Sequence, residues 1–83
     1  MRNFLEFVLI SLVQHPDDVQ VEETQQDNHF TYTIHVHPED VGRIIGRQGR
    51  IIEAIRSLLR VRAVKDNVTT TVRVASDVDE QLS

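Results

Sequence analysis

The sequence contains no cysteine, so neither a disulfide framework nor a thiolate metal site can contribute to its stability or chemistry. Secreted domains of this size usually depend on disulfides, and an intracellular location is therefore the default expectation. Only three glycines and two prolines interrupt the chain, and 40% of its 83 residues are hydrophobic, which is too apolar for a disordered segment. A chain of this length has room for one domain with a thin core.

Long apolar runs are also missing. The most hydrophobic segment, residues 4–13, contains Glu6 and is much shorter than the roughly 20 residues that a membrane-spanning helix needs. A secretory signal is not expected either, because His15-Pro16-Asp17-Asp18 follows where a small-residue cleavage site would stand. We therefore expect this segment to form a buried helix, and we expect no membrane association.

Catalytic and metal-binding patterns are weak or absent. No serine lies beside a candidate base, and the glycine-bounded segment at residues 46–49 lacks the Gly-Lys-Ser/Thr ending of a P-loop. His35 and His37 are two residues apart on a predicted strand and so share one face, but the sequence suggests no third ligand. We interpret them as surface histidines, and we expect no metal site, no cofactor and no enzymatic activity.

The net charge of −4 argues at first against nucleic acid, because affinity for phosphate comes largely from lysine and arginine. The distribution of charge points the other way. Residues 43–65 hold seven of the nine basic residues and only one acid, Glu53, which gives this stretch a charge of +6. The rest of the chain carries −10, so a basic stretch stands against an acidic body and can orient a polyanion toward one face.

Hydrophobic periodicity predicts an α+β domain with the order α-β-β-α-α-β, in which three helices pack on one face of a three-stranded sheet. We expect this domain to span residues 1–75, and the acidic residues 76–83, which lack an apolar pattern, to fray as a tail. The predicted elements are a helix from residue 3 to about 15, a hairpin of strands 19–24 and 30–36 with its turn at 25–28, a short helix at 38–45, a helix from residue 50, and a strand at 68–74.

Helical spacing also predicts which faces are buried. In the first helix the stripe of Leu5, Val8, Leu9 and Leu12 should face the sheet. In the helix after residue 49 the expected stripe is Ile51, Ala54, Ile55, Leu58 and Leu59. A surplus of apolar residues remains off these stripes, namely Phe4, Phe7, Ile10 and Ile52, and such a surplus is typical of an interface.

Gly46-Arg47-Gln48-Gly49, called here the GxxG loop, joins two predicted helices through a glycine-bounded turn. Glycine permits a positive φ and a close approach of another backbone, and the next helix begins with free N–H groups, so phosphate is the natural guest. A bare GxxG also occurs in ordinary helix turns. Here two isoleucines precede it and basic residues flank it, which favours RNA binding over a mere turn.

With these flanks the loop resembles the signature of the KH domain, and the α-β-β-α-α-β order is similar to the type II arrangement of that fold. More closely, the chain resembles the KhpA (YlqC) family of stand-alone bacterial KH proteins from about residue 3 to residue 74. The matching pieces are residues 12–19, 38–50 and 55–59. One departure is the pair Asp66-Asn67, where the family has a turn that contains glycine.

The resemblance implies a cytoplasmic RNA-binding protein, an RNA chaperone, that acts with a second KH protein, KhpB, and affects cell-wall growth and cell shape. Its expected partners are single-stranded RNA and a KhpB-like protein, with a homodimer of the chain, to which the apolar surplus points, as the open alternative. Arg56 and Arg60 are interpreted as part of a solvated helix face. The residues expected to bind RNA are Gly42, Arg43, Ile45, Gly46, Arg47, Gln48, Gly49, Arg50 and Ile51.

An alternative stays open at this point. The apolar first helix and an exposed sheet edge could make the chain a protein-interaction module, in which the fold mainly assembles a complex and RNA contact is secondary.

Overall fold

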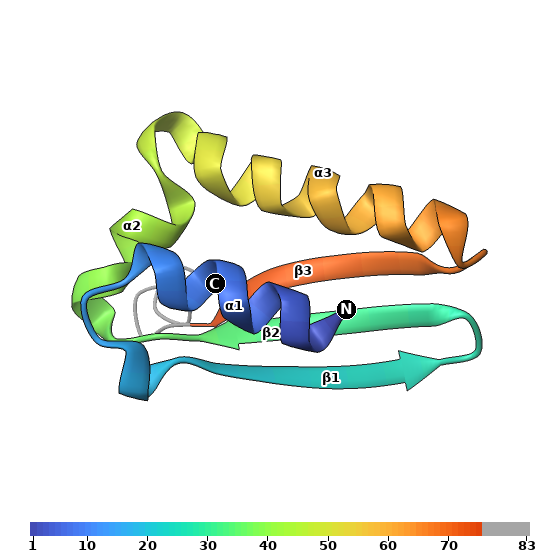
Figure 1. Cartoon of the computed structure of the whole chain (residues 1–83), viewed down its shortest axis with the longest axis horizontal. Helices are drawn as coiled ribbons and strands as arrows, with labels where there is room; N and C mark the ends of the chain where they lie inside the picture. Colours follow the sequence, from blue (N-terminus) through green and yellow to red (C-terminus); the bar gives the residue numbers. More distant parts are fainter. Residues whose placement is uncertain (76–83) are drawn as a thin grey trace.

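The computed structural model of the chain describes residues 1–75, and its elements follow one another in the predicted order (Figure 1). The predicted tail, residues 76–83, lies outside the described residues. Three short 3-10 helices, η1 to η3, punctuate the longer elements. The bounds are α1 Arg2–Leu12, η1 Pro16–Asp18, β1 Gln20–Gln26, β2 His29–His35, η2 Pro38–Asp40, α2 Val41–Ile45, η3 Arg47–Gly49, α3 Arg50–Lys65 and β3 Thr69–Ala75.

The three strands form one sheet in the order β1-β2-β3, and the helices cover one of its faces, as the periodicity predicts (Figure 1). β1 and β2 are antiparallel, with Glu23 opposite Tyr32, whereas β2 and β3 are parallel, with Tyr32 opposite Val72. The hairpin turn is tighter than predicted because β1 continues to Gln26, and Asp27 makes the reversal at a positive φ of 54°. β2 is thus the central strand and β3 is an edge strand within the described sheet.

Alternation along β2 places Tyr32 and Ile34 in the core, where both are fully buried. Leu5 and Leu9 from the predicted stripe of α1 are also buried, while Val8 and Leu12 pack at the margin. Phe4, Phe7 and Ile10 remain 48–70% exposed, as their positions off the stripe predict. Periodicity therefore identifies the buried face of α1 and β2 correctly.

The predicted face of α3 is only partly right: Ile55 and Leu59 are buried and Ile51 packs at the margin of the core, but Ala54 and Leu58 do not. The buried residues of this helix are Ile52, Ile55, Leu59 and Ala63, whereas Ala54 is exposed and Leu58 is 50% exposed. Two overlapping sets of apolar residues follow helical spacing in this segment, and they share Ile55 and Leu59. Ile52 therefore belongs to the core and not to the exposed surplus, and the exposed apolar residues of α3 are instead Leu58, Val61 and Val64.

Among residues 1–75 no helix combines the length and the apolar character needed to cross a membrane. The longest helix, α3, is 16 residues long and carries several charges.

The corrected face of α3 can be tested with two leucines that are adjacent in the sequence. Leu59→Ala should lower the free energy of unfolding by about 2–5 kcal/mol, because it leaves a cavity in the core. Leu58→Ala, the matched control, should cost no more than about 1 kcal/mol, because half of that side chain is already in water. Urea denaturation of the two variants measures the difference, and equal losses would show that the assignment of the buried face is wrong.

Candidate nucleic-acid interface

The buried carboxylate of Asp40 joins the end of α1 to the beginning of α2. Asp40 is fully buried, and its Oδ1 and Oδ2 accept hydrogen bonds from the backbone N–H groups of Gln14 and His15, each at 3.0 Å. In a continued helix these two N–H groups would donate to carbonyl oxygens one turn earlier. Their hydrogen bonds to Asp40 explain why α1 ends at Leu12, although the sequence predicted an end near residue 15.

Burial alone would raise the pKa of Asp40, but the N–H groups of Gln14 and His15, with the nearby charges of His15 and Arg43, outweigh it. The pKa of this carboxyl therefore lies below its ordinary value of 3.8. Nη1 of Arg43 lies 3.6 Å from Oδ1 and donates to the carbonyl oxygen of Glu39. Arg43 is thus partly engaged by the protein itself.

The GxxG loop follows α2 directly, and its first glycine is required on two grounds. Gly46 has φ 77° and ψ 173°, a conformation that is essentially restricted to glycine. A Cβ at this position would lie 2.6 Å from Cγ1 of Ile51, closer than nonbonded atoms approach. Gly49 also has a positive φ, 76°, but a Cβ there would meet open space. Gly46 therefore packs directly against the first turn of α3, and the loop is bound tightly to that helix.

The remaining loop residues extend the backbone into solvent. Gln48 adopts a left-handed conformation with φ 59°, and the N–H of Gly49 donates to the carbonyl oxygen of Gly46. Arg47 and Gln48 are exposed. Figure 1 shows the loop projecting beyond the sheet, above α2, at the N-terminal end of α3.

The nine predicted RNA-binding residues lie in three consecutive parts of the chain, namely α2, the GxxG loop and the first turn of α3. Ile45, Gly46, Gly49 and Ile51 are half-buried, and the others, Gly42, Arg43, Arg47, Gln48 and Arg50, are exposed. Gly42 lies in α2 with open space around its Cα, so this side of α2 is unobstructed. The half-buried Ile45 and Ile51 offer apolar edges beside the loop.

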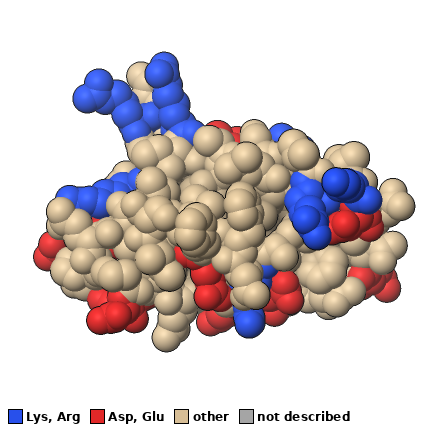
Figure 2. All heavy atoms as spheres, viewed as in Figure 1, with Lys and Arg blue, Asp and Glu red and all other residues tan. Residues whose placement is uncertain are grey.

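Ion pairing divides the basic stretch into two groups. Three of its arginines have carboxylate partners, namely Arg43 with Asp40, Arg56 with Glu53 and Arg62 with Asp66. In the part of the chain that the structure describes, Arg47, Arg50, Arg60 and Lys65 form no ion pair. Basic side chains stand off the surface at the end of the molecule that holds the loop (Figure 2). The unpaired charge thus includes Arg47 within the loop and Arg50 directly after it.

Arg56 does not belong to a solvated face, contrary to the prediction, whereas Arg60 is exposed as expected. Nε and Nη2 of Arg56 donate to the carbonyl oxygen of Val72 at 3.2 and 3.0 Å. The side chain therefore attaches α3 to the edge strand β3. Beside it lies an open pocket of about 230 Å³ between α3 and β3, lined by Arg56, Arg60, Thr70, Thr71 and Val72.

His35 and His37 do not share a strand face, because β2 ends at His35. Nε2 of His35 lies 3.0 Å from Oε1 of Glu22 on the neighbouring strand, whereas His37 turns toward the segment after α1. The expectation that they share one strand face is therefore wrong, although both side chains are partly exposed, as expected of surface histidines.

An apolar groove lies away from the loop, between α1 and α3. It has a volume of about 360 Å³ and is lined by Met1, Phe4, Leu58 and Val61, with Arg62 and Lys65 at its rim. The sequence indicated the contribution of α1 to this surface. It did not indicate that of α3, since Leu58 was assigned to the core.

Comparison with known proteins identifies relatives over nearly the whole chain. The family model described as "KhpA/KhpB, KH domain" matches residues 2–75. The chain is 42% identical over 74 residues to the RNA-binding protein KhpA of Clostridium acetobutylicum, and the aligned residues cover 89% of this chain and 99% of that relative. It is 38% identical over 77 residues to the RNA-binding protein KhpA of Chlamydia muridarum, where the aligned residues cover 93% of this chain and 99% of the relative. No solved structure matches the chain significantly.

The two glycines of the loop should differ in their tolerance of a side chain. Gly46→Ala should lower the free energy of unfolding by about 3 kcal/mol or more, because the backbone is strained and the methyl group collides with Ile51. Gly49→Ala should cost only about 1–2 kcal/mol, the penalty of a left-handed alanine. Chemical denaturation measures both values, and a Gly46→Ala variant as stable as Gly49→Ala would contradict the described packing.

Asp40 predicts a distinctive dependence of stability on pH. Because its pKa is lower in the folded protein than in the unfolded chain, its ionised form stabilises the fold above about pH 4. That contribution is lost as the pH falls through the lower, folded-state pKa. Asp40→Asn should be less stable than the wild type at pH 7, because the amide places an NH₂ group against a backbone donor.

The difference in unfolding free energy between wild type and Asp40→Asn should therefore shrink as the pH is lowered from 5 toward 2. Denaturation curves at several pH values give this difference, in which the other carboxylates cancel. A difference that stays constant over this range would mean that the charge of Asp40 is not what joins the two segments.

Proposed function

Because the chain belongs to the KhpA/KhpB family of KH domains, we propose that it is an RNA-binding protein that holds single-stranded RNA against its GxxG loop. The observation that carries this proposal is the glycine-only conformation of Gly46 beside two arginines, Arg47 and Arg50, that have no carboxylate partner among the described residues. The relatives named RNA-binding protein KhpA support the same proposal.

The phosphates would lie along the loop and the first turn of α3. There another backbone can approach closely at Gly49, which carries no side chain and has open space beside it. The first turn of α3 also has no side-chain cap, and the positive end of its helix dipole favours a phosphate. Arg47 and Arg50 would add charge on either side of Gln48. KH loops of this kind clamp roughly four nucleotides, which matches the short reach of the loop.

The bases would lie on the surface beside the loop, over the apolar edges of Ile45 and Ile51. The open side of α2 at Gly42 leaves room for them. Opposite α2, the edge strand β3 would form the other side of this base-binding surface. The pocket near Arg60 and Thr70 lies against this strand. This surface is aliphatic and shallow, so affinity for one isolated domain should be weak and should come largely from phosphate contacts.

We infer that useful affinity needs two domains, since linked sites gain through effective concentration without new contacts. A KhpB-like KH protein is the partner we propose, in line with the name of the matching family model. In that complex the chain would act in the cytoplasm as an RNA chaperone. Roles in cell-wall growth and cell shape would follow from the RNAs it binds.

The groove between α1 and α3 is where we propose that this partner docks. Phe4, Leu58 and Val61 are 48–72% exposed, and they gather on a face that does not include the loop. RNA and partner could therefore be bound at the same time. This groove also favours a second function, in which assembly is the primary role and RNA contact is secondary.

Reversing the charge of the loop should abolish RNA binding. The double variant Arg47→Asp, Gln48→Asp places two carboxylates where phosphates would lie, yet both positions are exposed, so the stability should change by only about 0.5 kcal/mol per site. Fluorescence anisotropy with a labelled unstructured RNA measures binding, and circular dichroism verifies the fold. Wild-type affinity should also fall with salt, with a logarithmic slope of roughly −0.7 per phosphate neutralised.

The matched control is Arg73→Asp, Gln26→Asp, which changes the net charge equally at exposed positions. Arg73 follows the buried Val72 in β3, so strand alternation places it on the open face of the sheet and not on the proposed RNA surface. It should retain most of the affinity. If the folded loop variant binds like the wild type, or if the control loses binding equally, then the loop is not the RNA clamp.

Partner binding in the groove between α1 and α3 can be tested independently of RNA binding. Phe4→Ser with Val61→Ser should weaken binding to a KhpB-like protein in sedimentation experiments while leaving RNA affinity of the isolated chain unchanged. Ile10→Ser, also 48% exposed on α1 but outside the groove, serves as the control and should bind the partner normally. A chain that stays monomeric at high concentration and does not bind the KhpB-like protein would contradict this proposal, and self-association alone would make the groove a homodimer interface.

A further inference from the structure

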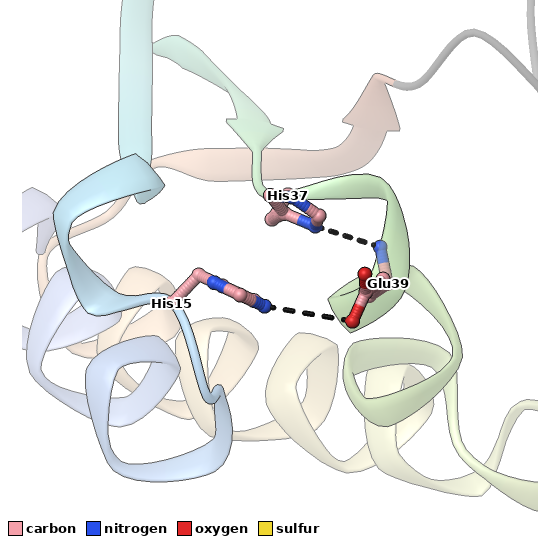
Figure 3. Close-up of side chains that lie close together, drawn as sticks. All are labelled: His15, His37 and Glu39. Atoms are coloured by element: carbon pink, nitrogen blue, oxygen red, sulfur yellow. Dashed lines mark hydrogen bonds and ion pairs between the residues drawn. The ribbon is translucent and has the colours of Figure 1, made fainter.

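Three side chains with metal-binding atoms meet where the segment after α1 approaches η2 (Figure 3). His15 precedes η1, His37 follows β2, and Glu39 lies within η2. One ligand atom from each residue lies within 4.8 Å of the other two. Nε2 of His15 is 3.6 Å from Oε2 of Glu39, and the two imidazole rings stack with their centroids 4.0 Å apart.

We propose that His15, His37 and Glu39 form a binding site for a divalent transition-metal ion of the zinc class, with water completing the coordination. Two imidazole nitrogens and one carboxylate oxygen suit Zn²⁺, Ni²⁺ or Cu²⁺, whereas Mg²⁺ and Ca²⁺ prefer sites made of oxygen alone. With bonds of about 2.0–2.1 Å, tetrahedral Zn²⁺ holds its ligand atoms about 3.3 Å apart. The separation between His15 and Glu39 is already close to this value.

The contacts of the two rings show what must change for an ion to bind. The rings of His15 and His37 stack with their centroids 4.0 Å apart, so they now lie face to face. Nδ1 of His37 accepts a hydrogen bond from the N–H of Glu39 at 3.0 Å, which shows a lone pair directed at η2. The ion must compete with this hydrogen bond, and the stacked rings must rotate to converge on it.

The surroundings of the cluster support a cation. Asp40 is fully buried next to Glu39, and its carboxylate accepts a hydrogen bond from the backbone N–H of His15. It therefore fixes the backbone segment that carries His15 and adds negative charge near the site. Arg43 offsets part of this charge.

A bound ion would join the segment after α1 to the beginning of α2 by a second connection beside Asp40. Since α2 carries the GxxG loop, the ion would stabilise the base on which the loop stands. Binding to the folded state alone would also raise the unfolding temperature as the metal concentration rises. This inference does not depend on RNA binding.

The test is isothermal titration of untagged protein with ZnCl₂, with MgCl₂ as the comparison ion. The wild type should bind one Zn²⁺ saturably and show no saturable binding of Mg²⁺. His15→Asn and Glu39→Gln should each weaken Zn²⁺ binding by roughly tenfold or more. Glu39 is exposed, so its replacement should leave the fold intact even if His15→Asn does not fold.

His29→Asn is the matched control because it also removes one histidine, but from the opposite end of β2, where His29 contacts Thr69 and Thr71. It should bind Zn²⁺ like the wild type. Chemical shifts of the imidazole nitrogens during the titration should change for His15 and His37 and not for His29. The proposal is overturned if the wild type shows no saturable Zn²⁺ binding, if Glu39→Gln binds unchanged, or if His29→Asn loses binding equally.

Discussion

The buried carboxylate of Asp40 is the interaction on which the arrangement of this small domain depends. It binds the two N–H groups that follow α1, and it stands immediately before α2, so one side chain ends the first helix and ties that end to the residue that precedes the second. A domain of this size has a thin core, and α2 contributes only Ile44 as a buried residue. A polar anchor therefore fixes what hydrophobic packing alone would hold weakly.

From that anchor the chain reaches the GxxG loop within six residues, and the contact between Gly46 and Ile51 passes the constraint on to α3. The loop is thus held from both sides, although its own middle residues are exposed. Nearby carboxylates partly neutralise Arg43, Arg56 and Arg62. Arg47 and Arg50, at the loop, have no such partner among the described residues. An acidic protein can present a basic surface in this way, because position and pairing decide the local field and net charge does not.

Period-two and helical patterns predicted the element order, the hairpin and the buried face of α1, because each of these depends on a simple repeat of apolar residues. The face of α3 was not predictable, since Leu58 and Ile52 each complete a helical stripe with Ile55 and Leu59, and periodicity alone does not choose between the two stripes. The role of Asp40 was not predictable either, because it depends on contacts with Gln14 and His15, which lie 26 and 25 positions earlier in the sequence. Asn67, with φ 58°, explains how the turn before β3 forms without the glycine expected from the family.

The central claim is that RNA lies along the surface from α2 through the GxxG loop to the first turn of α3. Titration of ¹⁵N-labelled protein with an unstructured RNA oligonucleotide, followed by NMR, tests this claim most directly. The account predicts that the largest amide shifts occur at residues 42–51, with smaller ones along the adjoining edge of β3. Shifts concentrated on the groove between α1 and α3, or on the open face of the sheet, would contradict it.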